Sequence, residues 1–171
     1  MNAEIDRLLS ERKIDWRYGQ TKLMFAYRHS DKIKAILNNS PLQKIMEFVL
    51  GTDITLFQSI NFHYGSNQKA HSDSVHMSTF PQGNLIAAWI ALEDIQPGSG
   101  ELEYYPASHR LPYITNQDFE HGGNRWFLGK APYDGYEAKM QEVISEHELE
   151  SQRFLPRKGD VLIWHANLLH G

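Results

Sequence analysis

The sequence predicts one mainly β domain with flanking helices, an antiparallel sandwich or barrel. Two patterns carry this prediction. Residues 1–51 have the apolar periodicity of helices, whereas residues 52–171 contain short segments rich in β-branched and aromatic residues, separated by turns. A chain of 171 residues is long enough to bury one core. We therefore expect a single domain, with a helical part at 1–51 and a β core at 52–171.

Three helices are expected before Gly51. The first covers residues 3–12, and the second is capped by Ser30 or Asp31. The third begins at Ser40-Pro41, because proline is favoured at the first helical position, and it stops at Gly51. Its apolar stripe consists of Leu42, Ile45, Met46, Val49 and Leu50.

The β core is expected to contain strands within 55–64, 85–92, 101–105 and 161–164. Residues 113–153 interrupt this rhythm with glycines, aromatic residues and one helix. One face of that helix carries Tyr136, Met140, Val143, Ile144 and His147. Because so long an insertion between strands is usually functional, we expect it to form a lid.

Composition excludes several kinds of site. The chain has no cysteine, which rules out disulfides, iron–sulfur clusters and thiolate zinc sites. Its net charge of −4 and the lack of a basic block argue against nucleic acid or an anionic membrane as partner. No apolar run reaches the roughly 20 residues that cross a bilayer. We expect a cytoplasmic protein, and the sequence leaves its oligomeric state undetermined.

His71-Ser72-Asp73 is the central chemical motif. In an extended segment, residues i and i+2 project to the same side, so His71 and Asp73 can present an imidazole and a carboxylate to one ion. A third ligand can come from His165 or His170 near the end of the chain. Two histidines and one carboxylate on one face of an octahedral ion leave three positions open, the ligand set typical of non-haem iron(II) oxygenases.

The segment from His71 to Tyr113 and the closing KGDVLIWHANLLHG resemble the phytanoyl-CoA dioxygenase family of iron(II)/2-oxoglutarate oxygenases. The resemblance extends from about Phe57 to Gly171. It implies a double-stranded β-helix, a cupin-like jelly roll, with iron(II), 2-oxoglutarate and O2 as cofactor and co-substrates. It also implies that His71, Asp73 and His170 are the catalytic metal ligands, with His165 not a ligand.

The same resemblance places Trp89 in the 2-oxoglutarate pocket and suggests Asn61 as a donor to the co-substrate; plain core packing is the alternative for Trp89. The family arginine that binds the 5-carboxylate is expected on a strand after His170, beyond Gly171, so we expect the final strand to be missing from this chain. The alternative is that Arg110 or Lys69 supplies the cation.

The implied reaction is hydroxylation of a small molecule, with release of succinate and carbon dioxide. Asp73 favours hydroxylation, because the resembled halogenases have a small residue there. The alternative function is a non-catalytic cupin-like module that binds a metal or ligand without redox chemistry. In the lid, the residues considered for substrate contact are Trp126, Phe127, Tyr133 and Tyr136 for apolar groups and Arg110, Arg125 and Lys130 for anionic groups.

The remaining histidines are weaker candidates. His76 follows the motif closely and either faces substrate or has a structural role. His63 and His109 are interpreted as non-catalytic.

Overall fold

The computed structural model describes residues 2–17, 22–63, 65–77, 79–120, 122–123 and 132–171. The chain divides into two compact units: residues 1–66 with 97–100, and residues 67–96 with 101–171. The single-domain organisation stays a prediction. Within the described residues, no helix combines the length and apolar character that crossing a membrane requires.

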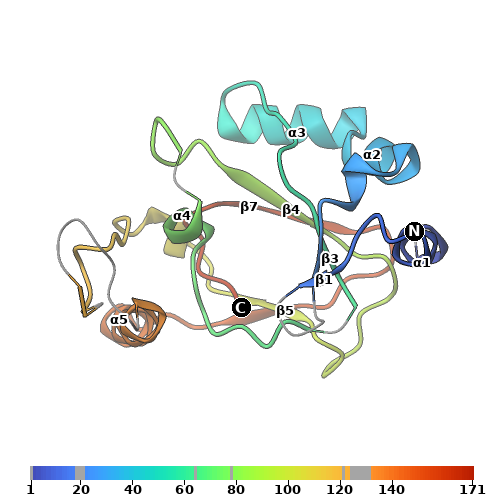
Figure 1. The fold of residues 1–171 in the computed structure, drawn as a ribbon. Helices are drawn as coiled ribbons and strands as arrows, with labels where there is room; N and C mark the ends of the chain where they lie inside the picture. Colours follow the sequence, from blue (N-terminus) through green and yellow to red (C-terminus); the bar gives the residue numbers. More distant parts are fainter. Residues whose placement is uncertain (1, 18–21, 64, 78, 121, 124–131) are drawn as a thin grey trace. The chain divides into compact units, whose positions relative to one another are not determined.

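The first unit combines helices with a small sheet (Figure 1). Its helices are α1 (Asn2–Ser10), the short 3-10 helix η1 (Ala26–Arg28), α2 (Asp31–Leu37) and α3 (Ser40–Leu50). Its antiparallel sheet has the order β1 (Trp16–Arg17), β2 (Lys22–Met24) and β3 (Ile60–Phe62). The part at 1–51, expected to be helical, therefore also contains two short strands. β1 and β2 are too short to give a period, and they exist because β2 pairs with the distant β3.

Helix boundaries in the first unit follow the predicted chemistry. Ser30 caps α2, since its side chain accepts from the backbone N–H of Ile33. α3 is capped by Asn39, one residue before the predicted start, and ends at Gly51 with φ 78°. No residue of α3 is buried, and Phe48 in it is 87% exposed. Its apolar stripe is thus a surface feature of the structure.

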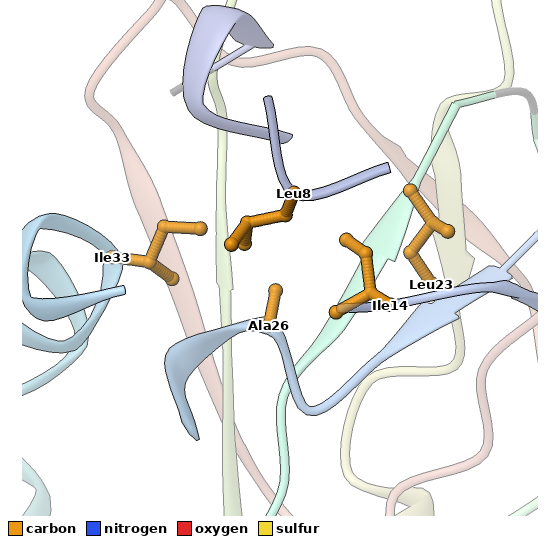
Figure 2. Packing of buried hydrophobic residues seen from close by; sticks show 5 residues of the cluster. All are labelled: Leu8, Ile14, Leu23, Ala26 and Ile33. Carbon is orange, nitrogen blue, oxygen red and sulfur yellow. The ribbon is translucent and has the colours of Figure 1, made fainter. Parts of the chain in front are cut away.

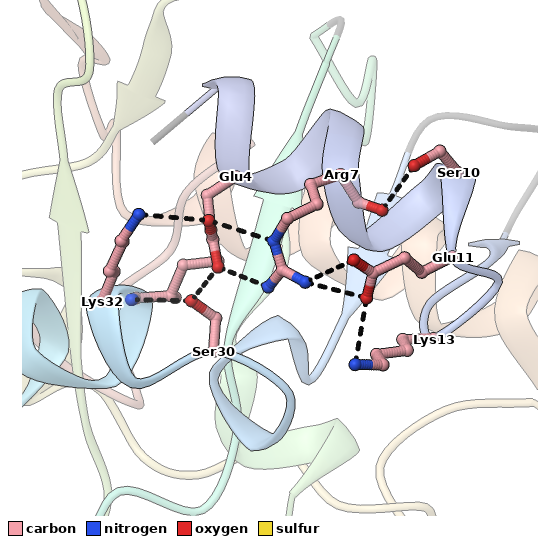
Figure 3. A network of polar contacts seen from close by, with 8 residues as sticks. Glu4, Arg7, Ser10, Glu11, Lys13, Ser30 and Lys32 are labelled. Carbon is pink, nitrogen blue, oxygen red and sulfur yellow. Dashed lines mark hydrogen bonds and ion pairs between the residues drawn. The ribbon is translucent and has the colours of Figure 1, made fainter.

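The core of the first unit is a cluster of apolar side chains around Leu8 of α1 (Figure 2). The cluster consists of Leu8 of α1, Ile14 of the segment before β1, Leu23 of β2, Ala26 of η1 and Ile33 of α2. A polar network also links α1 to α2 (Figure 3): Ser30 Oγ donates to Glu4, and Arg7 bonds both Glu4 and Glu11. The apolar cluster is the main stabilising feature, because exposed ion pairs contribute little.

The second unit holds two small sheets and the helix of the insertion. β4 (Ile86–Ile90) pairs antiparallel with β7 (Val161–His165), and β5 (Leu102–Tyr104) pairs with β6 (Gln152–Phe154). The helices are α4 (Asp73–His76), the 3-10 helix η2 (Ser108–Arg110) and α5 (Pro132–Glu146). β4, β5, β7 and α5 confirm the sequence prediction within a few residues. The sheets are small, however, so the described chain mixes helices and short strands instead of being clearly mainly β.

The two faces of the β4–β7 pair carry different side chains. Ala87 lies opposite Trp164, and Trp89 lies opposite Leu162. Directly paired residues in antiparallel strands project to the same side, so these four share one face. His165, paired with Ile86, projects from the other face.

Candidate metal centre

The end of the chain pairs with the segment that contains the HSD motif. The backbone N–H of His71 donates to the carbonyl of His170 at 2.9 Å, and the N–H of His170 donates back to His71 at 2.9 Å. His170 also bridges to Tyr104 of β5, so the C-terminal segment lies between β5 and the motif (Figure 1). This pairing brings the rings of His71 and His170 to a centroid distance of 4.5 Å.

The side chains of His71, Asp73 and His170 lie close together. Each offers one ligand atom, and these atoms all lie within 4.8 Å of one another. His71 and His170 are buried, at 7% and 6% exposure, and Asp73 is partly exposed. The motif is extended only as far as Ser72, and Asp73 is the first residue of α4. The arrangement is a buried pair of imidazoles with a carboxylate beside them.

Both imidazoles are oriented by backbone carbonyls. Nδ1 of His71 lies 3.0 Å from the carbonyl oxygen of Lys69, and Nδ1 of His170 lies 3.0 Å from that of Leu168. A carbonyl only accepts, so each Nδ1 carries the proton and each Nε2 keeps a free lone pair. This orientation of ligand histidines is the one found around bound metals.

Electrostatics keep the His71 ring neutral. Burial, reinforced by the neighbouring His170, lowers the pKa of His71 to about 4. Its charged form is therefore scarce near pH 7, and Nε2 remains available as a ligand.

Asp73 has a hydrogen-bond partner that sequence reasoning missed. The indole Nε1 of Trp164 donates to Oδ2 of Asp73 at 3.2 Å, whereas Oδ1 lies 3.8 Å from Nε2 of His170. The ring of Trp164 is also 4.9 Å from that of His170. The sequence predicts the strand that contains Trp164 but not its hydrogen bond to Asp73, because that bond depends on how β7 packs beside α4.

His165 lies outside the cluster. It ends β7 on the face opposite Trp164, with its ring 6.4 Å from that of Tyr113. Its Nδ1 accepts from the backbone N–H of Asn167 at 3.2 Å. The turn after β7 brings this N–H to the ring.

Gly171 leaves no room for a side chain. Its φ is not positive, but a Cβ there would lie 2.7 Å from the carbonyl oxygen of Gln68 and 3.2 Å from the N of Ala70. A side chain would push apart the two segments that carry His71 and His170.

α5 contacts the motif through its first turns. Tyr136, 2% exposed, accepts from the backbone N–H of Ser72 at 2.8 Å. Glu137 forms an ion pair of 2.6 Å with Lys69. Leu169, just before His170, packs against the buried residues of α5. The helix of the insertion thus touches both segments that supply the clustered ligand atoms.

The two cations considered for the 2-oxoglutarate carboxylate are placed differently. The ammonium of Lys69 is paired with Glu137, which raises the pKa of Lys69. Arg110 is exposed at the end of η2.

Of the co-substrate candidates, Trp89 shares the sheet face of Trp164 and contacts Phe154 at 5.9 Å between ring centroids. Asn61 lies in the first unit, opposite Leu23 in the β2–β3 pair. Its role toward the centre stays a prediction.

His76 is exposed at the end of α4, and its ring stacks on Tyr133 at 6.1 Å. It also lies 5.7 Å from the ring of His71. His63 contacts Trp16 in the first unit, and His109 lies on η2. The lid candidates Arg125, Trp126, Phe127 and Lys130 lie outside the described residues.

A cavity of about 280 Å³ lies beside the motif, in the second unit. It is lined by Ser74, Met77, Thr79, Gln82, Gly83, Leu85 and Ala166. Ser74 directly follows Asp73, and none of these lining side chains is charged.

Comparisons with known proteins agree with this architecture. The family model of phytanoyl-CoA dioxygenase matches residues 9–171. The chain is 28% identical over 108 residues to peroxisomal phytanoyl-CoA dioxygenase of Bos taurus, covering 62% of this chain and 28% of that protein. It is 26% identical over 148 residues to phytanoyl-CoA dioxygenase domain-containing protein 1 of Mus musculus, covering 83% and 44%. The chain therefore spans less than half the length of either relative.

Two solved structures share the fold. One is SnoK, a non-heme alpha-ketoglutarate-dependent carbocyclase from nogalamycin biosynthesis, with a TM-score of 0.69, 16% identity, and coverage of 99% of this chain and 65% of that one. The other is the epimerase SnoN in complex with Fe3+, alpha-ketoglutarate and nogalamycin RO, with a TM-score of 0.65, 20% identity, and coverage of 98% and 64%. Since the family model matches nearly the whole chain, this protein belongs to the phytanoyl-CoA dioxygenase family.

Proposed function

We propose that this chain carries the catalytic centre of a non-haem iron(II), 2-oxoglutarate-dependent dioxygenase that hydroxylates a small molecule. The observation that supports this proposal most directly is that the side chains of His71, Asp73 and His170 lie together. In both histidines, a backbone carbonyl bonded to Nδ1 orients the imidazole ring. Family membership supports the same reaction class. We further propose that the fold is the jelly roll implied by the resemblance, which the likeness to SnoK and SnoN supports.

The donor set fits iron(II). Two neutral imidazoles and a carboxylate suit a divalent transition metal and leave open positions on an octahedral ion. His71 and His170 would bind through Nε2, and Asp73 through Oδ1. The buried rings limit the access of water to their side of the ion. In the proposed function, the bound metal with 2-oxoglutarate and O2 supplies the oxidation of a C–H bond, yielding succinate, carbon dioxide and hydroxylated product.

We assign the remaining candidates as follows. Trp89 lines the 2-oxoglutarate pocket, because it shares the sheet face of Trp164, whose indole bonds Asp73. Lys69 is the weaker candidate for binding the 5-carboxylate, since its ammonium is already paired with Glu137. The uncharged cavity beside Ser74 would receive part of the substrate. A cytoplasmic location stays a prediction.

Hydroxylation is the proposed outcome rather than ring closure or epimerisation, the activities named for SnoK and SnoN. The non-catalytic cupin-like module is not favoured, because the three ligand positions are intact and oriented.

The test is turnover of 2-oxoglutarate. The purified full-length protein, with iron(II), ascorbate and 2-oxoglutarate under air, should form succinate slowly alone and faster with a suitable small molecule. Asp73→Ala is the control and should form none above background. Mass spectrometry should find one added oxygen atom in the product. If a broad panel of small molecules yields no succinate beyond the Asp73→Ala control, the proposal is wrong.

A further inference from the structure

The two oxygens of the Asp73 carboxylate have different neighbours. Oδ2 accepts the indole hydrogen of Trp164 at 3.2 Å, whereas Oδ1 lies 3.8 Å from Nε2 of His170. One oxygen is therefore engaged by a donor of the protein, and the other lies near Nε2 of His170. We propose that Trp164 is a positioning residue that keeps Asp73 a one-oxygen ligand of the metal.

This arrangement decides how many positions the metal has for its other ligands. The inference rests on the proposed function. An octahedral ion has six positions, and one atom from each of His71, Asp73 and His170 leaves three. A 2-oxo acid takes two and O2 takes one. Carboxylates also bind with both oxygens, and such a contact from Asp73 would remove one of those three positions. A hydrogen bond to Oδ2 opposes that second metal–oxygen contact.

The surroundings of Trp164 hold its indole in place. Trp164 lies in β7 opposite Ala87, whose small side chain leaves room on the face that both residues share. Its ring packs against His170 at 4.9 Å between centroids. Phenylalanine would fill much of the same space, but it has no hydrogen to donate, whereas the indole Nε1–H is purely a donor. The proposed role therefore depends on one N–H group and can be tested by removing it.

Two variants separate the hydrogen bond from packing. Trp164→Phe removes the donor and part of the ring. Replacing Trp164 with 3-benzothienylalanine, in which sulfur takes the place of the N–H, keeps the ring size and removes the donor alone. Trp16→Phe, in the first unit, is the matched control for the same chemical change.

The readout is anaerobic loading with cobalt(II) and oxalate, followed by titration with azide. Oxalate chelates through two oxygens, needs no anchor for a distal carboxylate, and leaves the third position for azide. Both Trp164 variants should still bind cobalt(II) and oxalate, but their affinity for azide should fall about 10-fold or more, the range for loss of a partner of a metal ligand. The visible spectrum of bound cobalt should also change before oxalate is added. Trp16→Phe should match the unchanged protein.

The outcomes distinguish the two proposals. If the unchanged protein binds cobalt(II) but no oxalate, both the proposed function and the inference fail. If the unchanged protein and both Trp164 variants take azide equally well beside oxalate, with identical spectra, only the role of Trp164 is refuted. The third outcome is that the benzothienyl variant keeps its circular dichroism spectrum but no longer binds cobalt(II). Trp164 would then be needed for metal binding itself rather than for keeping one coordination position open, and the inference would again be overturned.

Discussion

At the residue scale, the closing segment WHANLLHG contains two histidines with opposite surroundings. His170 is buried, with its Nε2 3.8 Å from Asp73, whereas His165 lies on the other face of the β4–β7 pair. Identical substitutions at the two positions should therefore have different consequences. Comparing the alanine variants of His165 and His170 therefore separates the role of His170 as a metal ligand from the general effect of losing an imidazole ring.

We predict that His170→Ala loses metal, as Asp73→Ala does, because two remaining ligands hold a divalent ion poorly. His165→Ala should keep the metal but lose about 1–3 kcal/mol of unfolding free energy, because the N–H of Asn167 loses its acceptor. Anaerobic calorimetry with cobalt(II) and urea unfolding measure the two effects. Equal metal affinity of His170→Ala and the unchanged protein would refute the ligand assignment.

The proximity of His71 and Asp73 could be anticipated from sequence because their i, i+2 spacing is local. The choice of His170 over His165 came from the family pattern, since both lie in the same segment. The Trp164–Asp73 hydrogen bond and the hydroxyl of Tyr136 on Ser72 could not be anticipated. Both join residues more than 60 positions apart, so they depend on strand register and helix docking rather than on any local pattern.

At the element scale, α5 was predictable because it is long enough to show a period. Tyr136, Met140 and Val143 are buried as the pattern predicts. The strands β1 and β2, with two and three residues, are too short to show a period in their sequence. β2 pairs with β3, which is distant in sequence, and a local pattern does not contain that contact.

The contact of α5 with the motif gives an element-scale prediction. Tyr136→Phe should lower the unfolding free energy by about 1–3 kcal/mol, because the buried N–H of Ser72 loses its acceptor. The midpoint of urea unfolding measures this. Tyr133→Phe, on an exposed residue of the same helix, is the control and should change stability by less than about 0.5 kcal/mol. Equal effects of both variants would contradict the role assigned to Tyr136.

At the scale of the whole molecule, the ligand cluster, the cavity and α5 all belong to the second unit. The cavity begins at Ser74, next to Asp73, and its lining combines hydroxyl, amide and apolar side chains without a charge. An uncharged group of a substrate can therefore bind there without leaving a charged side chain unpaired. In the proposed function, substrate and metal would therefore bind to neighbouring residues that can be changed separately.

Met77→Trp should fill part of this cavity while leaving the three ligand positions intact. Cobalt(II) affinity and slow succinate formation without substrate should then stay unchanged, because neither requires the cavity. The acceleration of succinate formation by a stimulating small molecule should fall, with a raised KM, since the indole competes for the same space. Phe80→Trp is the control: Phe80 is fully exposed nearby and does not line the cavity. Undiminished stimulation in Met77→Trp, with the metal bound normally, would place the substrate elsewhere and leave the metal centre untouched.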